Sequence, residues 1–162
     1  MPRWAPPIHC RPRRRSRYRL AVDQMTSLVE ALVGHRLASV TRLAWHQPGE
    51  PVELVKSNVG PVHLVFDGGR GLLVDGRSDW TLRCTETAPG DEAWLATYDY
   101  DWDGARWLPR DASAEAPFGA VIGKSLTDWA PVLNEVNELV GIDLEFEGER
   151  VNLRLWEGEL TT

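Results

Sequence analysis

Apolar and polar residues alternate most regularly near the C-terminus, at positions 142–146 and again at 151–155. Successive side chains of a strand point to opposite faces, so this period of two predicts a pair of half-buried strands. The intervening Gly148-Glu149 predicts a tight hairpin turn. The cross-strand pairs that this turn predicts are Glu147 with Arg150, Phe146 with Val151 and Asp143 with Arg154. Apolar partners would then meet on one face of the hairpin and opposite charges on the other.

A helical spacing of apolar residues precedes this hairpin. The apolar positions are Trp129, Val132, Leu133, Val136, Leu139 and Val140. Separations of three, four and seven residues are typical of one face of an amphipathic helix. Thr127 or Asp128 can cap its start, and Gly141 favours its end. Pro131 would fall in the first turn, where proline is tolerated, so we expect a packed helix over residues 127–140.

Shorter patterns upstream predict further strands and a second helix. A strand is expected over residues 37–45 and a meander over 52–87, with a hairpin turn at Asp67-Gly68-Gly69 where glycine accepts a positive φ. Ser27 and Glu30 have the spacing of a capping box, which predicts a short N-terminal helix. The predicted fold class is therefore α+β: a twisted antiparallel sheet or small open barrel, with the longer helix packed on one face.

Residues 1–24 are rich in proline and arginine and poor in apolar residues. Such a composition does not bury enough apolar surface to order itself, so it predicts a disordered basic tail. Two interpretations stay open: a basic arm that binds nucleic acid, or an extension upstream of a true start at Met25. The predicted organisation is a tail over 1–24 and a single acidic domain over 25–162.

Charge is distributed unevenly between the tail and the domain. The chain has 162 residues with 18 basic and 24 acidic side chains, a net charge of −6. The tail holds seven arginines and one aspartate, which leaves the domain with 11 basic and 23 acidic residues, a net charge of −12. An acidic domain repels nucleic acid and anionic membranes and attracts basic molecules. We therefore expect a basic protein partner, and no nucleic acid or membrane contact through the folded domain.

Cysteine use and hydropathy favour a cytoplasmic protein. Cys10 and Cys84 lie one in the tail and one in the domain, and they form neither a disulfide framework nor a CxxC metal motif. A reducing compartment is the simplest location for such a chain. No stretch approaches the roughly 20 apolar residues that a membrane span requires.

The sequence contains no arrangement of residues that is typical of an enzyme. His35, His46 and His63 are scattered without the spacing of metal ligands. A nucleophilic site made of Cys84, His63 and Asp75 would need a thiolate beside a base. Cys84 instead falls on the apolar side of its predicted strand. We therefore expect a protein with no catalytic residues and no cofactor.

The sharpest local pattern is an acidic and aromatic segment at residues 98–107. Aspartates at three alternate positions followed by Gly104 match the first half of a calcium-binding loop, but Arg110 stands where such a loop needs a bidentate glutamate. The candidate metal ligands are Asp99, Asp101 and Asp103. The alternatives are a half-buried strand of no special role and an exposed ridge that binds a protein. The candidate partner-binding residues are Tyr98, Asp99, Tyr100, Asp101, Trp102, Asp103 and Trp107.

Along residues 25–155, segments with the alternating pattern of strands are separated by glycines at predicted turns. They run through Leu32-Val33-Gly34, Val40, residues 62–68, Ile122-Gly123-Lys124, Asn134, Asn137 and residues 141–146. In this order the chain resembles small bacterial domains of the toxin-immunity-protein type. The resemblance implies a non-catalytic protein-binding domain, such as an immunity-type inhibitor of a basic toxin. The alternative is a metal-dependent, small-molecule or carbohydrate-binding protein that uses the 98–107 segment.

Overall fold

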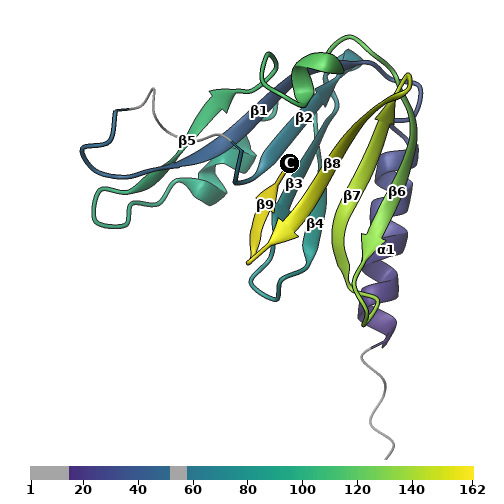
Figure 1. Cartoon of the computed structure of the whole chain (residues 1–162), viewed down its shortest axis with the longest axis horizontal. Coiled ribbons are helices and arrows are strands. Elements are labelled where there is room, and N and C mark those ends of the chain that lie inside the picture. The colour runs from purple at the N-terminus through teal and green to yellow at the C-terminus, as the bar shows by residue number, and fades with distance from the viewer. Residues whose placement is uncertain (1–14, 52–57) are drawn as a thin grey trace, which may run out of the picture.

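The computed structural model describes residues 15–51 and 58–162, and within them the chain is an α+β protein dominated by antiparallel strands (Figure 1). The helix α1 spans Arg15–Glu30. A five-stranded sheet contains β1 (Leu37–His46), β2 (Val62–Phe66), β3 (Gly71–Gly76), β4 (Leu82–Thr87) and β5 (Arg106–Asp111). A four-stranded sheet contains β6 (Leu126–Leu133), β7 (Leu139–Phe146), β8 (Glu149–Trp156) and β9 (Glu159–Thr161). The α+β prediction is confirmed at this level.

The two sheets share one hydrophobic core. Their strand orders are β4-β3-β2-β1-β5 and β6-β7-β8-β9, so the strands form two sheets where the sequence predicted one sheet or a small barrel. Phe66 of β2 and Phe146 of β7 stack across the core with ring centroids 6.4 Å apart. Met25, Val29 and Leu32 add the buried face of α1 and the turn after it. Figure 1 shows α1 at one end of the molecule and the β1–β5 pair projecting at the other.

The C-terminal hairpin is present, with its turn one residue earlier than predicted. The turn is Glu147-Gly148, with φ values of 47° and 91°. A two-residue turn with both residues left-handed favours glycine at its second position, and this places Gly148 there. Pairing therefore runs Phe146 with Glu149, Glu145 with Arg150 and Leu144 with Val151. Because the pairing shifts by two residues, each side chain keeps its predicted face, and Arg154 Nη2 still reaches Asp143 Oδ1 at 2.5 Å.

The predicted helix over 127–140 is wrong, because this segment forms β6, a turn and the start of β7. Asn134 Oδ1 accepts hydrogen bonds from the backbone N–H groups of Val136 and Glu138, which stabilises the turn. Val136 therefore stands at the turn, 69% exposed, instead of on a buried helical face. Pro131 is accommodated because β6 is an edge strand, where a missing N–H costs little.

The N-terminal helix is longer than the capping pattern predicted. Residues 15–24 are helical, which corrects the expectation of disorder for that part of the tail; residues 1–14 lie outside the described residues. Ser27 is inside α1 and donates its hydroxyl to the Asp23 carbonyl at 3.2 Å, so it is not a cap. Burial of Met25 and Val29 anchors the helix, and extension from an anchored turn is easier than nucleation. No helix of the described residues is long and apolar enough to span a bilayer.

Candidate functional site

Two tryptophans meet at the projecting end of the five-stranded sheet. The strand β5 pairs with β1, and the register sets Trp45 directly opposite Trp107. Their ring centroids are 5.2 Å apart and their planes meet at 67°. Edge-to-face geometry of this kind is favourable for aromatic pairs. The pairing joins segments far apart in the sequence and creates the base of a candidate site.

Residues 100–105 extend this aromatic surface. Trp107 Nε1–H donates a hydrogen bond to the Tyr100 hydroxyl at 2.8 Å, and the Tyr100 ring lies 6.3 Å from that of Trp45. Backbone hydrogen bonds of 2.8 and 2.9 Å join Trp102 to Ala105 around an Asp103-Gly104 turn. That turn needs positive φ values, 52° and 85°, which suit aspartate and glycine. The turn leaves the Trp102 side chain 72% exposed.

These side chains line two adjoining hollows, which together we name the aromatic groove. The first has a volume of about 580 Å³ and the second about 660 Å³. Residues lining both are Trp45, Gln47 and Tyr100. The first adds Glu50, Val59, Trp107 and Glu159, and the second adds Pro48, Trp102, Asp103 and Ala105. The groove thus has indole and phenol walls and carboxylates at its margin.

Glu159 reaches the groove because β9 is tied to the five-stranded sheet by a buried arginine. Arg42 is 1% exposed and its Nη2 donates to the carbonyls of Leu160 at 2.9 Å and Asn58 at 2.8 Å. Burial lowers the pKa of Arg42 to about 10, so it still carries its charge at neutral pH. These bonds fix the strand that holds Glu159. Partial burial raises the pKa of Glu159 above its ordinary value.

The carboxylates at the groove have no basic partner in the part of the chain that the structure describes. Ion pairs formed there involve neither Glu50, Glu159 nor Asp103. The nearby cation Arg106 is exposed and alternates with Trp107 along β5, so it points to the other face of the strand. Within residues 15–51 and 58–162, the groove therefore has carboxylates without a paired cation beside its aromatic walls.

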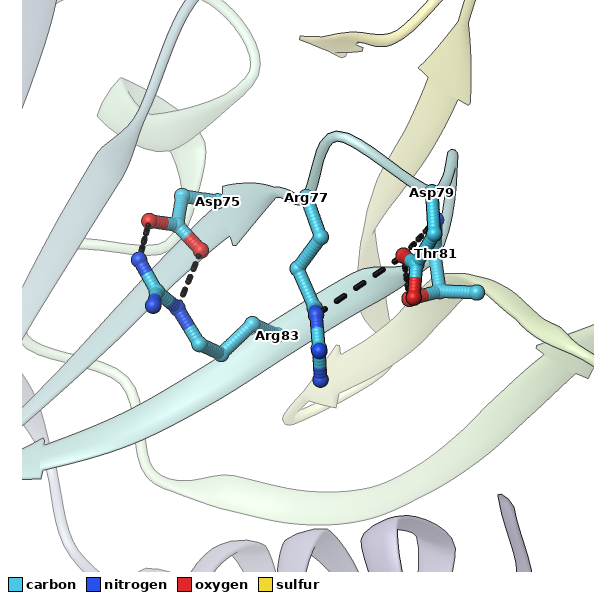
Figure 2. A network of polar contacts seen from close by, with 5 residues as sticks. All are labelled: Asp75, Arg77, Asp79, Thr81 and Arg83. Carbon is cyan, nitrogen blue, oxygen red and sulfur yellow. Dashed lines mark hydrogen bonds and ion pairs between the residues drawn. The ribbon is translucent and has the colours of Figure 1, made fainter. Parts of the chain in front are cut away.

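Tyr98 is an anchor and does not line the groove. Its hydroxyl donates to the Asp75 carboxylate, which is 3% exposed and also accepts bonds from Arg83 Nε at 3.0 Å and Nη2 at 2.6 Å. Figure 2 shows the Asp75–Arg83 pair beside a separate contact in which Asp79 accepts the Thr81 hydroxyl. Burial and the neighbouring Asp75 raise the pKa of the Tyr98 phenol. The Asp75 cluster (Asp75, Arg83 and Tyr98) fixes the start of the segment that leads to Trp102.

The structure divides the predicted ridge residues into three groups. Tyr100, Trp102, Asp103 and Trp107 line the aromatic groove. Tyr98 ends a 3-10 helix, Ala93–Tyr98, and faces Asp75. Asp99 and Asp101 are exposed outside the groove, where Asp101 Oδ1 accepts the Gly104 N–H at 2.6 Å. Residues 98–105 are thus not the half-buried strand that was one of the alternatives, since they form the end of a 3-10 helix and a tight turn.

Sequence reasoning did not assign Trp45, Glu50 or Glu159 to the site. Trp45 had a signal, because it ends the strand predicted over 37–45 as a large aromatic residue beside a turn. Its partner across the strands is set by the β1–β5 pairing, which no local pattern encodes. Glu159 had no signal in the sequence.

The residues of the alternative nucleophilic site do not converge. His63 lies on one face of the sheet, where its Nε2 is 2.7 Å from the Thr87 hydroxyl and burial lowers its pKa. Cys84 points to the opposite face against the core, and burial raises the pKa of its thiol to about 12. Asp75 is engaged by Arg83 and Tyr98. Among the described residues, no group of three or more His, Cys, Asp or Glu side chains is placed to hold a metal ion.

Comparisons of the chain with protein-family models, with curated proteins and with solved structures found no match. The resemblance to immunity-type domains therefore stays a prediction.

Proposed function

We propose that this chain is a non-catalytic binding protein whose aromatic groove docks a basic protein partner. The observation that carries the proposal is the juxtaposition of exposed indole and phenol rings with carboxylates that form no ion pair among the described residues. Trp102 is 72% exposed and Tyr100 is 50% exposed, next to the half-buried Trp45 and Trp107. Tryptophan and tyrosine dominate the binding energy of protein interfaces.

The charge of the domain selects the chemistry of the partner. A net charge of −12 over residues 25–162 steers basic proteins toward the molecule and repels acidic ones. Exposed Asp99, Asp101 and Asp103 concentrate that charge beside the groove. An immunity-type inhibitor is one form of this function, since an acidic surface can occupy the groove in which a basic nuclease binds phosphates.

The test compares what the immobilised chain and its variants retain from an extract of the native host, quantified by mass spectrometry. Trp102→Ala removes the most exposed ring of the groove. Trp156→Ala is its matched control, because Trp156 is 70% exposed on β8 and lies outside the groove. We expect a basic protein that wild type and Trp156→Ala retain and Trp102→Ala loses. Equal retention by all three would contradict the proposal.

The salt dependence of binding separates this function from the carbohydrate alternative. Sugars also stack on exposed indole faces, but a neutral oligosaccharide has no charge for the aspartates to attract. A basic partner should associate more slowly as ionic strength rises, and Asn at positions 99, 101 and 103 should flatten that dependence. Binding that is independent of salt in the wild type would favour the carbohydrate alternative.

A further inference from the structure

Resting on the proposed function, we infer that the aromatic groove takes the side chain of one arginine of the partner. The guanidinium lies against the indoles of Trp45 and Trp107 and donates hydrogen bonds to Glu159. The groove would then recognise one particular side chain, in addition to the general attraction between an acidic domain and a basic protein.

The aromatic walls suit a flat cation. A guanidinium is attracted to the face of a tryptophan ring and stacks on it, because the ring's π-face is negative. The only polar atom of the Trp107 indole is already used, since its N–H donates to Tyr100 at 2.8 Å. What Trp107 offers a ligand is therefore its π-face. The 67° angle to Trp45 sets a second ring against the same hollow.

The carboxylates favour a cation that carries N–H donors. Glu159 and Glu50 line the same hollow as the two tryptophans, and the described residues supply neither with an ion-pair partner. A carboxylate at the margin of an aromatic hollow gains a charge-assisted hydrogen bond when a ligand supplies an N–H donor. Arginine has five such donors in a planar fork, whereas a quaternary ammonium has none.

The Trp107 wall of the groove is held in place by its neighbours in the fold. Gly60, with φ of +116°, packs so closely that a Cβ on it would lie 2.8 Å from Cζ3 of Trp107 and 2.2 Å from the Leu43 carbonyl oxygen. The Trp107 ring is therefore held by backbone on one side and by its bond to Tyr100 on another. A ring that is already held in place loses little entropy when a ligand stacks on it, which favours recognition of a single side chain.

The experiment titrates the full-length ¹⁵N-labelled chain with three blocked pentapeptides, and follows the indole N–H signals by NMR. Each peptide is Gly-Gly-X-Gly-Gly, where X is arginine, the neutral isostere citrulline, or lysine. Signals are assigned with single Trp→Phe variants. We expect the arginine peptide to shift the signals of Trp45 and Trp107. We expect citrulline to bind about tenfold more weakly, and lysine between the two.

Two glutamate variants complete the test. Glu159→Gln should weaken the arginine peptide by about tenfold, whereas Glu157→Gln, an exposed residue of the adjacent turn that does not line the groove, should leave its affinity unchanged. Equal binding of arginine and citrulline, equal binding of arginine and lysine, or shifts confined to Trp80 and Trp156 would each overturn the inference. If the peptides fail while Trp102→Ala still abolishes capture of a basic protein, the proposed function stands without the arginine site. If the peptides bind while Trp102→Ala leaves capture of a basic protein unaffected, the groove binds arginine but the proposed function fails.

Discussion

Replacement of Tyr98 by phenylalanine tests whether the Asp75 cluster holds the segment that forms the groove. The change deletes one hydroxyl and leaves the ring, which packs edge-to-face on Trp94 with centroids 6.3 Å apart. The deleted hydroxyl donates to Asp75, a carboxylate that is only 3% exposed. Water therefore has little access to replace the lost donor.

The size of the effect follows from the remaining partners of Asp75. Hydrogen bonds to charged groups contribute about 1.5–3 kcal/mol to the free energy of unfolding. The loss is largest when a buried acceptor is left with no donor at all, because its desolvation is then not compensated. Arg83 still supplies two hydrogen bonds, so the carboxylate stays paired. We therefore expect Tyr98→Phe to lower the free energy of unfolding by about 1.5–2 kcal/mol, near the lower end of that range.

Urea denaturation at neutral pH measures this loss, with Tyr100→Phe as the matched control. The same hydroxyl is removed from Tyr100, a side chain that is 50% exposed, so water can take its place. The control should stay within about 0.5 kcal/mol of wild type, as surface substitutions do. Equal losses for the two variants, or a loss below about 0.5 kcal/mol for Tyr98→Phe, would refute the anchoring role.

Three further predictions concern the core and its surroundings. Phe146→Ala should destabilise the fold by about 3–5 kcal/mol in urea, since Phe146 is fully buried; a loss below about 1 kcal/mol would contradict its place in the core. A double-mutant cycle on Asp143 and Arg154, whose side chains are 35% and 37% exposed, should give a coupling of about 0.2–1 kcal/mol, and a value near zero would argue against the ion pair. Burial raises the pKa of Cys84 to about 12, so its half-buried thiol stays protonated at about pH 8. Iodoacetamide should therefore label Cys84 much more slowly in the native chain than in urea, with peptide mass spectrometry to resolve it from Cys10; equal labelling rates in the two states would contradict this.

The strands at the C-terminus were predictable because their signal is local. Alternation over residues 142–146 and 151–155 determines which side chains are buried whatever the exact turn, so a turn misplaced by one residue left every face correct. The helix predicted over 127–140 was wrong because it also relied on a local pattern alone. Its apolar residues keep a helical spacing, but the turn held by the Asn134 side chain and the pairing of β6 with β7 decide its structure. The pairing of the two strands determined the structure, because a helical spacing of apolar residues can occur by chance in so short a segment.

Only part of the candidate site could be predicted from the sequence. Tyr100, Trp102 and Asp103 are near neighbours in the chain, so their clustering of charge and aromatic surface is visible in the sequence. Trp45 and Glu159 reach the same groove through the β1–β5 pairing and through the anchoring of β9, neither of which is a local property. The same limit hid the role of Tyr98, because its partner Asp75 lies on β3, 23 residues earlier in the chain.

Dissociation of the captured basic partner, measured by surface plasmon resonance, tests the groove most directly. If Trp102 is a central anchor, Trp102→Ala should cost about 2 kcal/mol or more, which shortens the lifetime of the complex by about 30-fold. Trp156→Ala, which removes an equally exposed ring elsewhere, should leave the lifetime unchanged. A complex that dissociates from Trp102→Ala at the wild-type rate, or from both variants equally fast, would contradict the aromatic groove as the binding surface.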